Sequence, residues 1–220
     1  MIDSTIQTYV SDLYTESDFF AKLRSDHADY PISKKETAAF LVNMLAITKP
    51  KRILEIGTCI GYSSMLMAST DPGITITTID RHQPMIDKAK HHFFTYGYDN
   101  RITLIEDSAL YALENMSEAD GQYDFIYLDA AKGQYIKFLP HLLRLLKKDG
   151  TMVSDNVLQD GTVAGEWESI EKRQRTIYNN MRQFLSVITS TPGLTSSVLT
   201  IGDGIALTTK TCDHIELDIV

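Results

Sequence analysis

The sequence predicts an α/β fold in which a mostly parallel β-sheet is covered by helices. From residue 52 onward, short apolar runs of strand length alternate with longer segments whose apolar residues recur at helical spacing. Several of these runs end at acidic residues, and the chain closes with two strand-like runs joined by Gly202–Asp203–Gly204, a hairpin signal. Strands that alternate with helices form a parallel sheet, whereas the closing hairpin adds one antiparallel strand.

Prolines and hydrophobic periodicity set the expected element boundaries. Pro31 and Pro50 interrupt helical patterns, whereas Pro84 suits the first turn of a helix because its missing N–H is not needed there. The expected helices cover residues 3–29, 34–47, 63–69, 84–96, 109–116, 135–146 and 166–190. The expected strands cover residues 52–56, 74–79, 102–105, 123–128, 151–154, 197–200 and 205–209. We find no linker, so we expect a single domain over residues 1–220, with residues 1–48 as a helical extension packed on a seven-stranded sheet.

The composition excludes several classes of protein. The chain has 220 residues, of which 43% are hydrophobic, and a net charge of −8. It has no run of about 20 apolar residues that would span a membrane, and no basic start with an apolar centre typical of a signal peptide. The two cysteines, Cys59 and Cys212, do not form a disulfide framework, so we expect a reducing, cytoplasmic location. An acidic chain does not bind nucleic acid over its whole surface, but a local basic patch is still compatible with binding.

Acidic residues stand where four of the predicted parallel strands end: Glu55, Asp80, Asp129 and Asp155. Ligands of such sheets bind outside the carboxyl ends of the strands. A strand interior does not tolerate unpaired carboxylates. The sequence therefore predicts a binding site at this edge of the sheet.

The stretch ILEIGTCIGYSS, residues 53–64, turns from a strand into a helix through two glycines. Gly57 and Gly61 allow a close backbone approach to a ligand, and the helix that begins near Ser63 offers unpaired amides and a positive dipole end. The spacing of the two glycines is neither the dinucleotide G-x-G-x-x-G pattern nor that of a phosphate loop. A tight strand-to-helix connection that binds no ligand would therefore also explain the glycines. Asp80 at the end of the next strand can accept both ribose hydroxyls, and together these features indicate a nucleoside cofactor without a pyrophosphate.

Asp129, Asp155 and Asn156 supply hard oxygen ligands from adjacent strand ends, which suit a divalent cation such as Mg²⁺. Asp155–Asn156 alone is also a common turn-forming pair. Lys132 follows Asp129 by one turn, where it can act as a base or orient a hydroxyl, or lie solvated at a helix start.

Five segments, in order, resemble the cation-dependent S-adenosylmethionine O-methyltransferases, the family of the catechol and caffeoyl-CoA enzymes. They are LEIGTCIGYSS, the strand end at Asp80, YDFIYLDAAKGQY, SDNVL and GDGIAL. The resemblance covers about residues 30–210 and implies a Rossmann-like class I methyltransferase fold. Within the family, DAAKGQY, DNVL and the chain length are most similar to bacterial members that methylate 5-hydroxyuridine in tRNA.

The resemblance implies a role for each matching position. The cofactor, S-adenosylmethionine, is expected to contact Ser33, Glu55, Gly57 and Ser63 with its methionine part, Asp80 with its ribose, and Ser108 and Ala109 with its adenine. Gly61 is expected to be a further cofactor-binding residue. Asp129 contacts cofactor and metal, and Asp155 and Asn156 complete the metal ligands. As a hypothesis for the reaction, Asp129 and Lys132 are the catalytic residues, with Lys132 accepting or steering the proton of the acceptor hydroxyl.

The methyl acceptor implied by the resemblance is 5-hydroxyuridine at the tRNA wobble position, which becomes 5-methoxyuridine. A tRNA anticodon loop needs cations near the site, and EKRQR, residues 171–175, with Arg182, is the best candidate, although it also fits a solvated helix face. Trp167 and Tyr178 are suited to base stacking or to packing. The alternatives are a small catechol-like or acyl-CoA phenolic substrate, and a non-catalytic nucleoside-binding protein. The resemblance also implies a homodimer.

Overall fold

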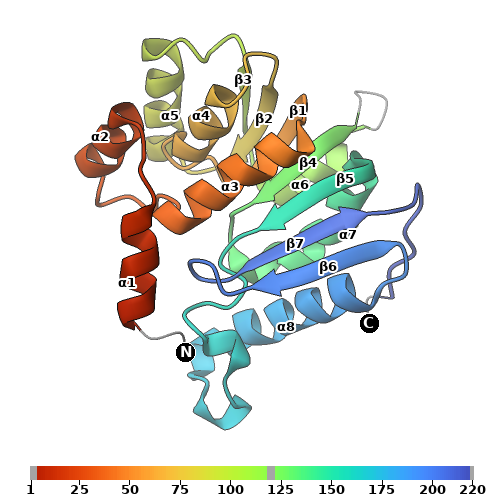
Figure 1. Cartoon of the computed structure of the whole chain (residues 1–220). Helices are drawn as coiled ribbons and strands as arrows, with labels where there is room; N and C mark the ends of the chain where they lie inside the picture. The colour runs from red at the N-terminus through yellow and green to blue at the C-terminus, as the bar shows by residue number, and fades with distance from the viewer. Residues whose placement is uncertain (1–3, 118–121, 219–220) are drawn as a thin grey trace.

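The centre of the fold is a seven-stranded sheet with helices on both faces, seen in a computed structural model that describes residues 4–117 and 122–218 (Figure 1). The strands are β1 Arg52–Ile56, β2 Thr75–Asp80, β3 Ile102–Glu106, β4 Tyr123–Leu128, β5 Leu146–Ser154, β6 Leu194–Leu199 and β7 Ile205–Lys210. The helices are α1 Ser4–Leu13, α2 Asp18–Asp26, α3 Lys35–Thr48, α4 Tyr62–Ser69, α5 Gln83–Thr95, α6 Ala109–Asn115, α7 Tyr135–Leu145 and α8 Arg175–Ser190. Short 3₁₀ turns are η2 Lys132–Gln134, η3 Thr162–Ala164, η4 Trp167–Ser169 and η5 Lys172–Gln174.

The strand order is β3–β2–β1–β4–β5–β7–β6, which confirms the predicted mostly parallel sheet. The chain runs outward from β1 to β2 and β3, and then crosses back to place β4 on the other side of β1. Ile53 in β1 is therefore paired with Ile76 of β2 and with Phe125 of β4. This reversal creates a crevice between β1 and β4 at the carboxyl edge of the sheet, where ligands bind in folds of this type.

The closing hairpin adds the predicted antiparallel strand. β7 runs antiparallel to both of its neighbours, β5 and β6, so β6 again points along the parallel strands. The hairpin turn at Gly202–Gly204 consequently lies at the carboxyl edge of β5, because Ser154, the last residue of β5, is paired with Ala206. This position brings the turn beside the predicted metal residues.

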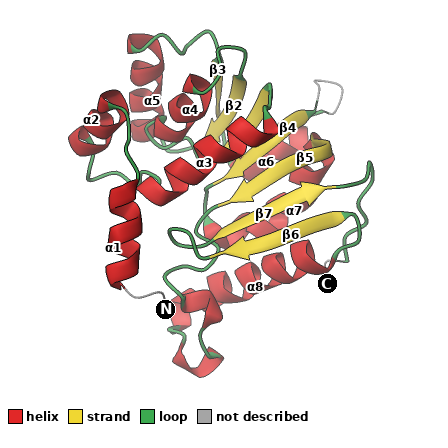
Figure 2. Ribbon diagram, in the orientation of Figure 1, coloured by secondary structure: helices red, strands yellow, loops and turns green. Residues whose placement is uncertain are grey.

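Each face of the sheet has its own hydrophobic core, as the helices in Figure 2 indicate. α6, α7 and α8 cover one face, with Leu139 and Phe184 fully buried. α2 to α5 cover the other face, with Leu41 and Met65 fully buried. Strands that are covered on both sides read as continuous apolar runs rather than as alternating patterns, which is why the β1 and β4 segments were predictable from their sequences.

Two predicted helices are shorter than expected. The helix predicted over residues 3–29 is divided into α1 and α2, because Ser17 adopts an extended conformation before Asp18 and starts a second helix; Asp3 lies outside the described residues. The helix predicted over residues 166–190 begins only at Arg175, since residues 162–174 form three separate 3₁₀ turns. Of the EKRQR stretch, residues 171–175, only Arg175 therefore lies in the α-helix that the sequence predicted to cover all of it. In the described part of the chain, no helix has both the length and the apolar character needed to cross a bilayer.

The Gly61→Ala substitution tests how closely the start of α4 is packed. Gly61 has a φ of +83°, and an added Cβ would lie 2.4 Å from Cε1 of the buried Phe93 ring. Left-handed strain and overpacking together should lower the free energy of unfolding by about 2–4 kcal/mol, measured by urea denaturation. Gly97→Ala is the matched control, because Gly97 also has a positive φ, +73°, but has open space around its Cα. The control should lose only about 1 kcal/mol; equal losses would show that the Phe93 contact does not matter.

Candidate active site

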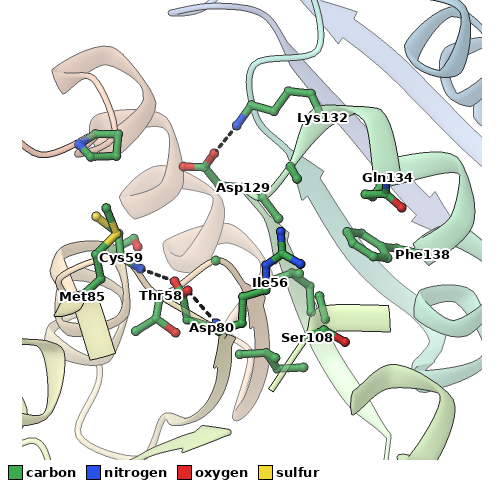
Figure 3. Close-up of a pocket in the computed structure, with 18 of the residues that line it drawn as sticks. Ile56, Thr58, Cys59, Asp80, Met85, Ser108, Asp129, Lys132, Gln134 and Phe138 are labelled. Atoms are coloured by element: carbon green, nitrogen blue, oxygen red, sulfur yellow. Dashed lines mark hydrogen bonds and ion pairs between the residues drawn. The ribbon is translucent and has the colours of Figure 1, made fainter. Parts of the chain in front are cut away.

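A cavity of about 610 Å³ opens at the carboxyl edge of the sheet, beside the crevice between β1 and β4 (Figure 3). This volume lies within the usual range for sites that bind small molecules and cofactors. Of the predicted site residues, the cavity is lined by Ser33, Gly57, Ser63, Asp80, Ser108, Ala109, Asp129 and Lys132. The fold thus brings together residues from loops that are far apart in the chain.

Gly57 permits the closest backbone approach at this edge. Its φ is +102°, and an added Cβ would lie 1.9 Å from the carbonyl oxygen of Asp129. Its N–H also donates to the carbonyl of Ile79 at 3.0 Å. A glycine is therefore required here to hold the loops after β1, β2 and β4 against one another.

Asp80 lines the cavity and also ties the neighbouring loops together. One carboxylate oxygen accepts from the backbone N–H of Cys59 at 2.9 Å, and the other accepts from Arg81 and His82 at 2.7 and 3.0 Å. Cys59 adopts a left-handed φ of +48°, which is uncommon outside glycine. The bond to Asp80 holds the glycine turn in this conformation at the mouth of the cavity (Figure 3).

Glu55 does not line the cavity; it is fully buried behind it. Its carboxylate accepts hydrogen bonds from the hydroxyls of Ser63, Ser64 and Thr78, which connect β1 to α4 and β2. Burial raises the pKa of Glu55 to about 7, since desolvation outweighs the three hydroxyl donors. Glu55 therefore holds the start of α4, including the cavity-lining Ser63, and its predicted contact with the cofactor stays a prediction.

Gly61 also faces away from the cavity. The position of an added Cβ lies against the Phe93 ring on α5, and the neighbours Ile60 and Tyr62 are the ones that line the cavity. Its positive φ makes the turn that starts α4. Gly61 thus has a packing role, and its predicted contact with the cofactor stays a prediction.

Ser108 and Ala109 line the cavity at the point where α6 begins. Ser108 is the N-cap of α6, and its hydroxyl accepts from the backbone N–H of Tyr111 at 3.4 Å. The carboxylate of Asp107 in turn accepts from the N–H of Ser108 at 2.6 Å. These bonds orient a short polar turn toward the cavity.

Lys132 and Asp129 form an ion pair at the rim of the cavity (Figure 3). The distance from Nζ to Oδ1 is 2.7 Å, and each side chain is 21% exposed. Lys132 is therefore not a solvated lysine, and its ammonium lies beside the carboxylate that was predicted to contact a metal. The pair is close enough to solvent for a substrate to reach it.

Asp155 and Asn156 lie one strand further along the same edge. The N–H of Asp155 donates to the carbonyl of Leu128, next to Asp129, at 2.9 Å. The Asp155 carboxylate is buried and accepts from the hydroxyl of Tyr127 at 3.0 Å and from the N–H of Asn156 at 2.7 Å. Burial, followed by repulsion from Asp129, raises the pKa of Asp155.

The residues at this edge fit a divalent cation. Two neighbouring carboxylates that repel each other, with an amide on the next residue, form a set of hard oxygen donors of the kind Mg²⁺ prefers. Within residues 4–117 and 122–218, no three His, Cys, Asp or Glu side chains gather as a metal site. The fit therefore rests on Asp129 and Asp155 together with the amide of Asn156.

Sequence reasoning missed several residues that line the cavity. Arg81 and Asp107 directly follow β2 and β3, so their positions at strand ends were a usable signal. Met85 and Phe138 come from the helices α5 and α7, and nothing in the sequence distinguishes them from core residues. They form apolar walls of the cavity.

The basic residues near α8 are partly engaged with their neighbours. Arg175 lies over the Trp167 ring at 4.7 Å, and Arg182 over the Tyr178 ring at 5.2 Å. The hydroxyl of Tyr178, a buried residue, donates to Gly165, so this ring packs within the fold. Arg173 is bound to Glu171 at 2.7 Å but is 81% exposed. Asn180 of α8 donates to the carbonyl of Gly133 at 2.7 Å, which ties this region to the turn after Lys132.

Comparisons with known proteins agree with this architecture. A Staphylococcus aureus structure, provisionally described as a caffeoyl-CoA O-methyltransferase, is 34% identical and covers 94% of this chain and 99% of that chain, with a TM-score of 0.84. The caffeoyl-CoA O-methyltransferase of Stellaria longipes is 28% identical over 205 residues, which are 86% of this chain and 82% of the relative. The S-adenosylhomocysteine-bound methyltransferase PaMTH1 of Podospora anserina is 24% identical with a TM-score of 0.80 and shows the shared fold.

The strand order of the mostly parallel seven-stranded sheet and the cavity at its edge define the class of protein, a Rossmann-like methyltransferase. More specifically, the chain belongs to the O-methyltransferase family, whose model matches residues 11–211. It is an S-adenosylmethionine-dependent O-methyltransferase of the caffeoyl-CoA type. A purely structural nucleoside-binding role is thereby excluded.

The Glu55→Gln substitution should make stability less dependent on pH. The pKa of Glu55 is about 7 in the folded chain against 4.5 in the unfolded chain. The folded state therefore binds an extra proton between these values, and the stability that this proton contributes is lost as the pH rises through about 7. A neutral Gln avoids this loss, so the variant should gain about 2 kcal/mol over the wild type between pH 5 and pH 8, measured by urea denaturation.

Glu106→Gln is the control for this comparison, because Glu106 is an exposed carboxylate whose hydrogen bond with Lys90 lowers its pKa. The difference in the free energy of unfolding between Glu106→Gln and the wild type should not grow with pH. Parallel pH curves for Glu55→Gln and the wild type would show that Glu55 is charged throughout the range.

Proposed function

We propose that the cavity binds S-adenosylmethionine and that its methyl group is transferred to a hydroxyl held beside Asp129 and Lys132. The observation that carries the proposal is a cavity with an apolar wall and an acidic rim at the reversal point of a parallel sheet. Asp80 would accept the ribose hydroxyls, and Ser108 and Ala109 would lie beside the adenine. Ser33, Gly57 and Ser63 would hold the methionine part.

The polar groups at the carboxyl ends of β4 and β5 are proposed to hold a divalent cation, Mg²⁺ by preference. The proposed ligands are the carboxylates of Asp129 and Asp155 and the amide oxygen of Asn156. A divalent cation would supply Lewis acidity, which lowers the pKa of a hydroxyl and orients it. Asp129 would contribute to both the cofactor side and the metal side, since it lines the cavity and lies next to Asp155.

Lys132 is proposed to manage the proton of the acceptor. Its ammonium is held on Oδ1 of Asp129 in the described structure, so the two charges neutralise each other before a substrate binds. With the Asp129 carboxylate bound to a cation, Nζ of Lys132 would be free to face the acceptor hydroxyl, which it would steer as an ammonium or deprotonate in its neutral form. Met85 and Phe138 line the cavity with apolar surface that would exclude water, and the surrounding loops would hold the acceptor at attack distance from the methyl group.

The proposed acceptor is 5-hydroxyuridine at the tRNA wobble position. The supporting features are the resemblance of DAAKGQY and DNVL to bacterial enzymes of this kind, and the exposed Arg173 beside Lys172. These cations precede α8, whose residues Ile177 and Asn180 contact the turn at Gly133. We therefore propose that Lys172 and Arg173 contact the phosphates of an RNA whose base enters the site.

The second candidate acceptor is a small phenol or a phenolic acyl-CoA. It is favoured by the caffeoyl-CoA enzymes among the relatives, such as that of Stellaria longipes. The net charge of −8 also suits a small substrate better than a polyanion. Both candidates present an acidic hydroxyl on a planar ring, so the same cofactor and metal residues would serve either one.

Asp129→Asn should reduce methyl transfer by about 10³-fold, because it removes one charge from the proposed cation site and from the ion pair with Lys132. The measurement is transfer from labelled S-adenosylmethionine with Mg²⁺ and with a chelator. Asp71→Asn is the control, since Asp71 forms a surface ion pair with Lys51, and it should keep wild-type activity. Full activity of the Asp129 variant in chelator would rule out the proposed metal role.

The acceptor is identified by offering the wild type a simple catechol and a tRNA that carries 5-hydroxyuridine, in parallel. Magnesium-dependent labelling of the tRNA alone would support the RNA acceptor, whereas labelling of the catechol alone would remove it and keep the cofactor and metal site. Under the RNA proposal, Arg173→Ala should raise the KM for tRNA about 3–10-fold, as expected for one lost phosphate contact. Lys148→Ala, in β5, is the matched control and should leave this KM unchanged.

A further inference from the structure

Two consecutive residues before α3 are each connected, through one intermediate side chain, to two consecutive residues after β5. Ser33 reaches Asp155 through Tyr127, and Lys34 reaches Asn156 through Asp203. The residues joined by each connection lie far apart in the sequence. Asp155 and Asn156 are the adjacent residues proposed above to bind a divalent cation.

The first connection is made of hydroxyl groups. The Ser33 hydroxyl lies 3.1 Å from the hydroxyl of Tyr127, which donates to Oδ2 of Asp155 at 3.0 Å. A tyrosine has a single hydroxyl proton. Because this proton is directed to Asp155, Ser33 is the donor to Tyr127. The ring of Tyr127 is fully buried in β4, so its hydroxyl is fixed in position and orients the carboxylate of Asp155.

The second connection is ionic. Nζ of Lys34 lies 2.6 Å from Oδ1 of Asp203, and Oδ2 of Asp203 accepts from Nδ2 of Asn156 at 3.2 Å. The amide nitrogen of Asn156 is thereby turned toward Asp203, which leaves the amide oxygen on the other side. Lys34 and Asn156 thus bind opposite oxygens of the Asp203 carboxylate and fix its orientation.

The backbone around the second connection is fixed as well. The carbonyls of Asp203 and Gly204 accept from the N–H groups of Leu158 and Val157 at 2.9 and 3.0 Å. Gly204 has a φ of +91°, and an added Cβ would lie 2.4 Å from Leu158. The hairpin turn is consequently a rigid support for the loop that carries Asp155 and Asn156.

The N-terminal helices hold the other end of both connections. Arg24 of α2 donates to the carbonyl of Ser33 at 2.6 Å and to the hydroxyl of Tyr62 at 2.8 Å, and it is paired with Glu16. Pro31, Ile32 and Ser33 also line the cofactor cavity. Residues 31–34, which we call the strap, are therefore anchored to α2 and connect the cavity to Asp155 and Asn156.

We propose that the strap is a positioning device for the metal ligands: Ser33 with Tyr127 orients Asp155, and Lys34 with Asp203 orients Asn156. The inference rests on the proposed cation site. Groups that hydrogen-bond metal ligands hold them in the binding orientation, and their loss typically weakens metal affinity by about 10–100-fold. Since the strap is part of the N-terminal extension, that extension contributes to metal binding without containing a ligand.

Tyr127→Phe tests the first connection, because it removes only the hydroxyl. Mn²⁺ affinity, measured by electron paramagnetic resonance on the full chain, should fall about 3–30-fold, the range expected for one lost support of a ligand. Saturating metal should restore kcat. Tyr123→Phe is the matched control: it lies in the same strand, and its hydroxyl donates to Thr77 at 3.1 Å. It should leave Mn²⁺ affinity unchanged.

Lys34→Met tests the second connection and keeps the aliphatic stem of the side chain. Mn²⁺ affinity should again fall about 3–30-fold. The double variant with Tyr127→Phe should show about the product of the two losses, because the connections act on different ligands. Lys22→Met is the control, since it removes an ion pair of similar length, to Asp26 at 2.9 Å, on the surface of α2.

The outcomes separate the strap from the function on which it rests. Wild-type affinity in both folded variants would overturn the positioning role and leave the proposed cation site intact. A wild-type chain that binds neither Mn²⁺ nor Mg²⁺ would overturn the cation site and the strap together. A loss of kcat that saturating metal does not restore would indicate a general structural role of these residues instead, and would also overturn the inference.

Discussion

The approach of Gly57 to the Asp129 carbonyl is the contact on which the rest of the site depends. At the point where the strand order reverses, the loops after β1 and β4 meet, and no side chain larger than hydrogen fits between them. This contact places Asp129 beside the cavity and also beside Asp155 on β5. One backbone constraint thus sets the separation between the cofactor side of the site and the proposed metal side.

The carboxylates at the edge of the sheet have different roles because their surroundings differ. Glu55 is enclosed by three hydroxyls and holds α4 in place. Asp80 accepts backbone N–H groups while still facing the cavity. Asp129 is paired with Lys132 at the rim, whereas Asp155 is buried beside it and has a raised pKa. A cation near Asp129 and Asp155 would relieve a repulsion that the fold has built in.

The N-terminal helices are more than a cover on one face of the sheet. Through Arg24 they hold the strap, and through the strap they reach the loop after β5. The position of residues 31–34 therefore affects both the cofactor cavity and the proposed cation ligands. By this arrangement the N-terminal helices would influence the chemistry of the site without contributing a reacting group.

Most of the fold was predictable from the sequence because its strands and helices are long enough to show their periodicity. β1 and β4 match the predicted bounds, and the other strands were found at the right places. Residues 14–17 and 166–174 were misjudged, since local helical spacing cannot reveal an extended Ser17 or a series of 3₁₀ turns held by ring contacts to α8.

By itself, the sequence determined which acidic residues end the strands, and hence that Asp80, Asp129, Asp155 and Asn156 share one edge. The physical reason is that parallel strands all end on the same side of a sheet. Only the tertiary structure decided that Glu55 and Gly61 face away from the cavity and that Met85 and Phe138 face into it. It also decided that Ser33 and Lys34 support Asp155 and Asn156. These outcomes depend on which side chains meet across elements that are distant in sequence, and periodicity within one element carries no information about such meetings.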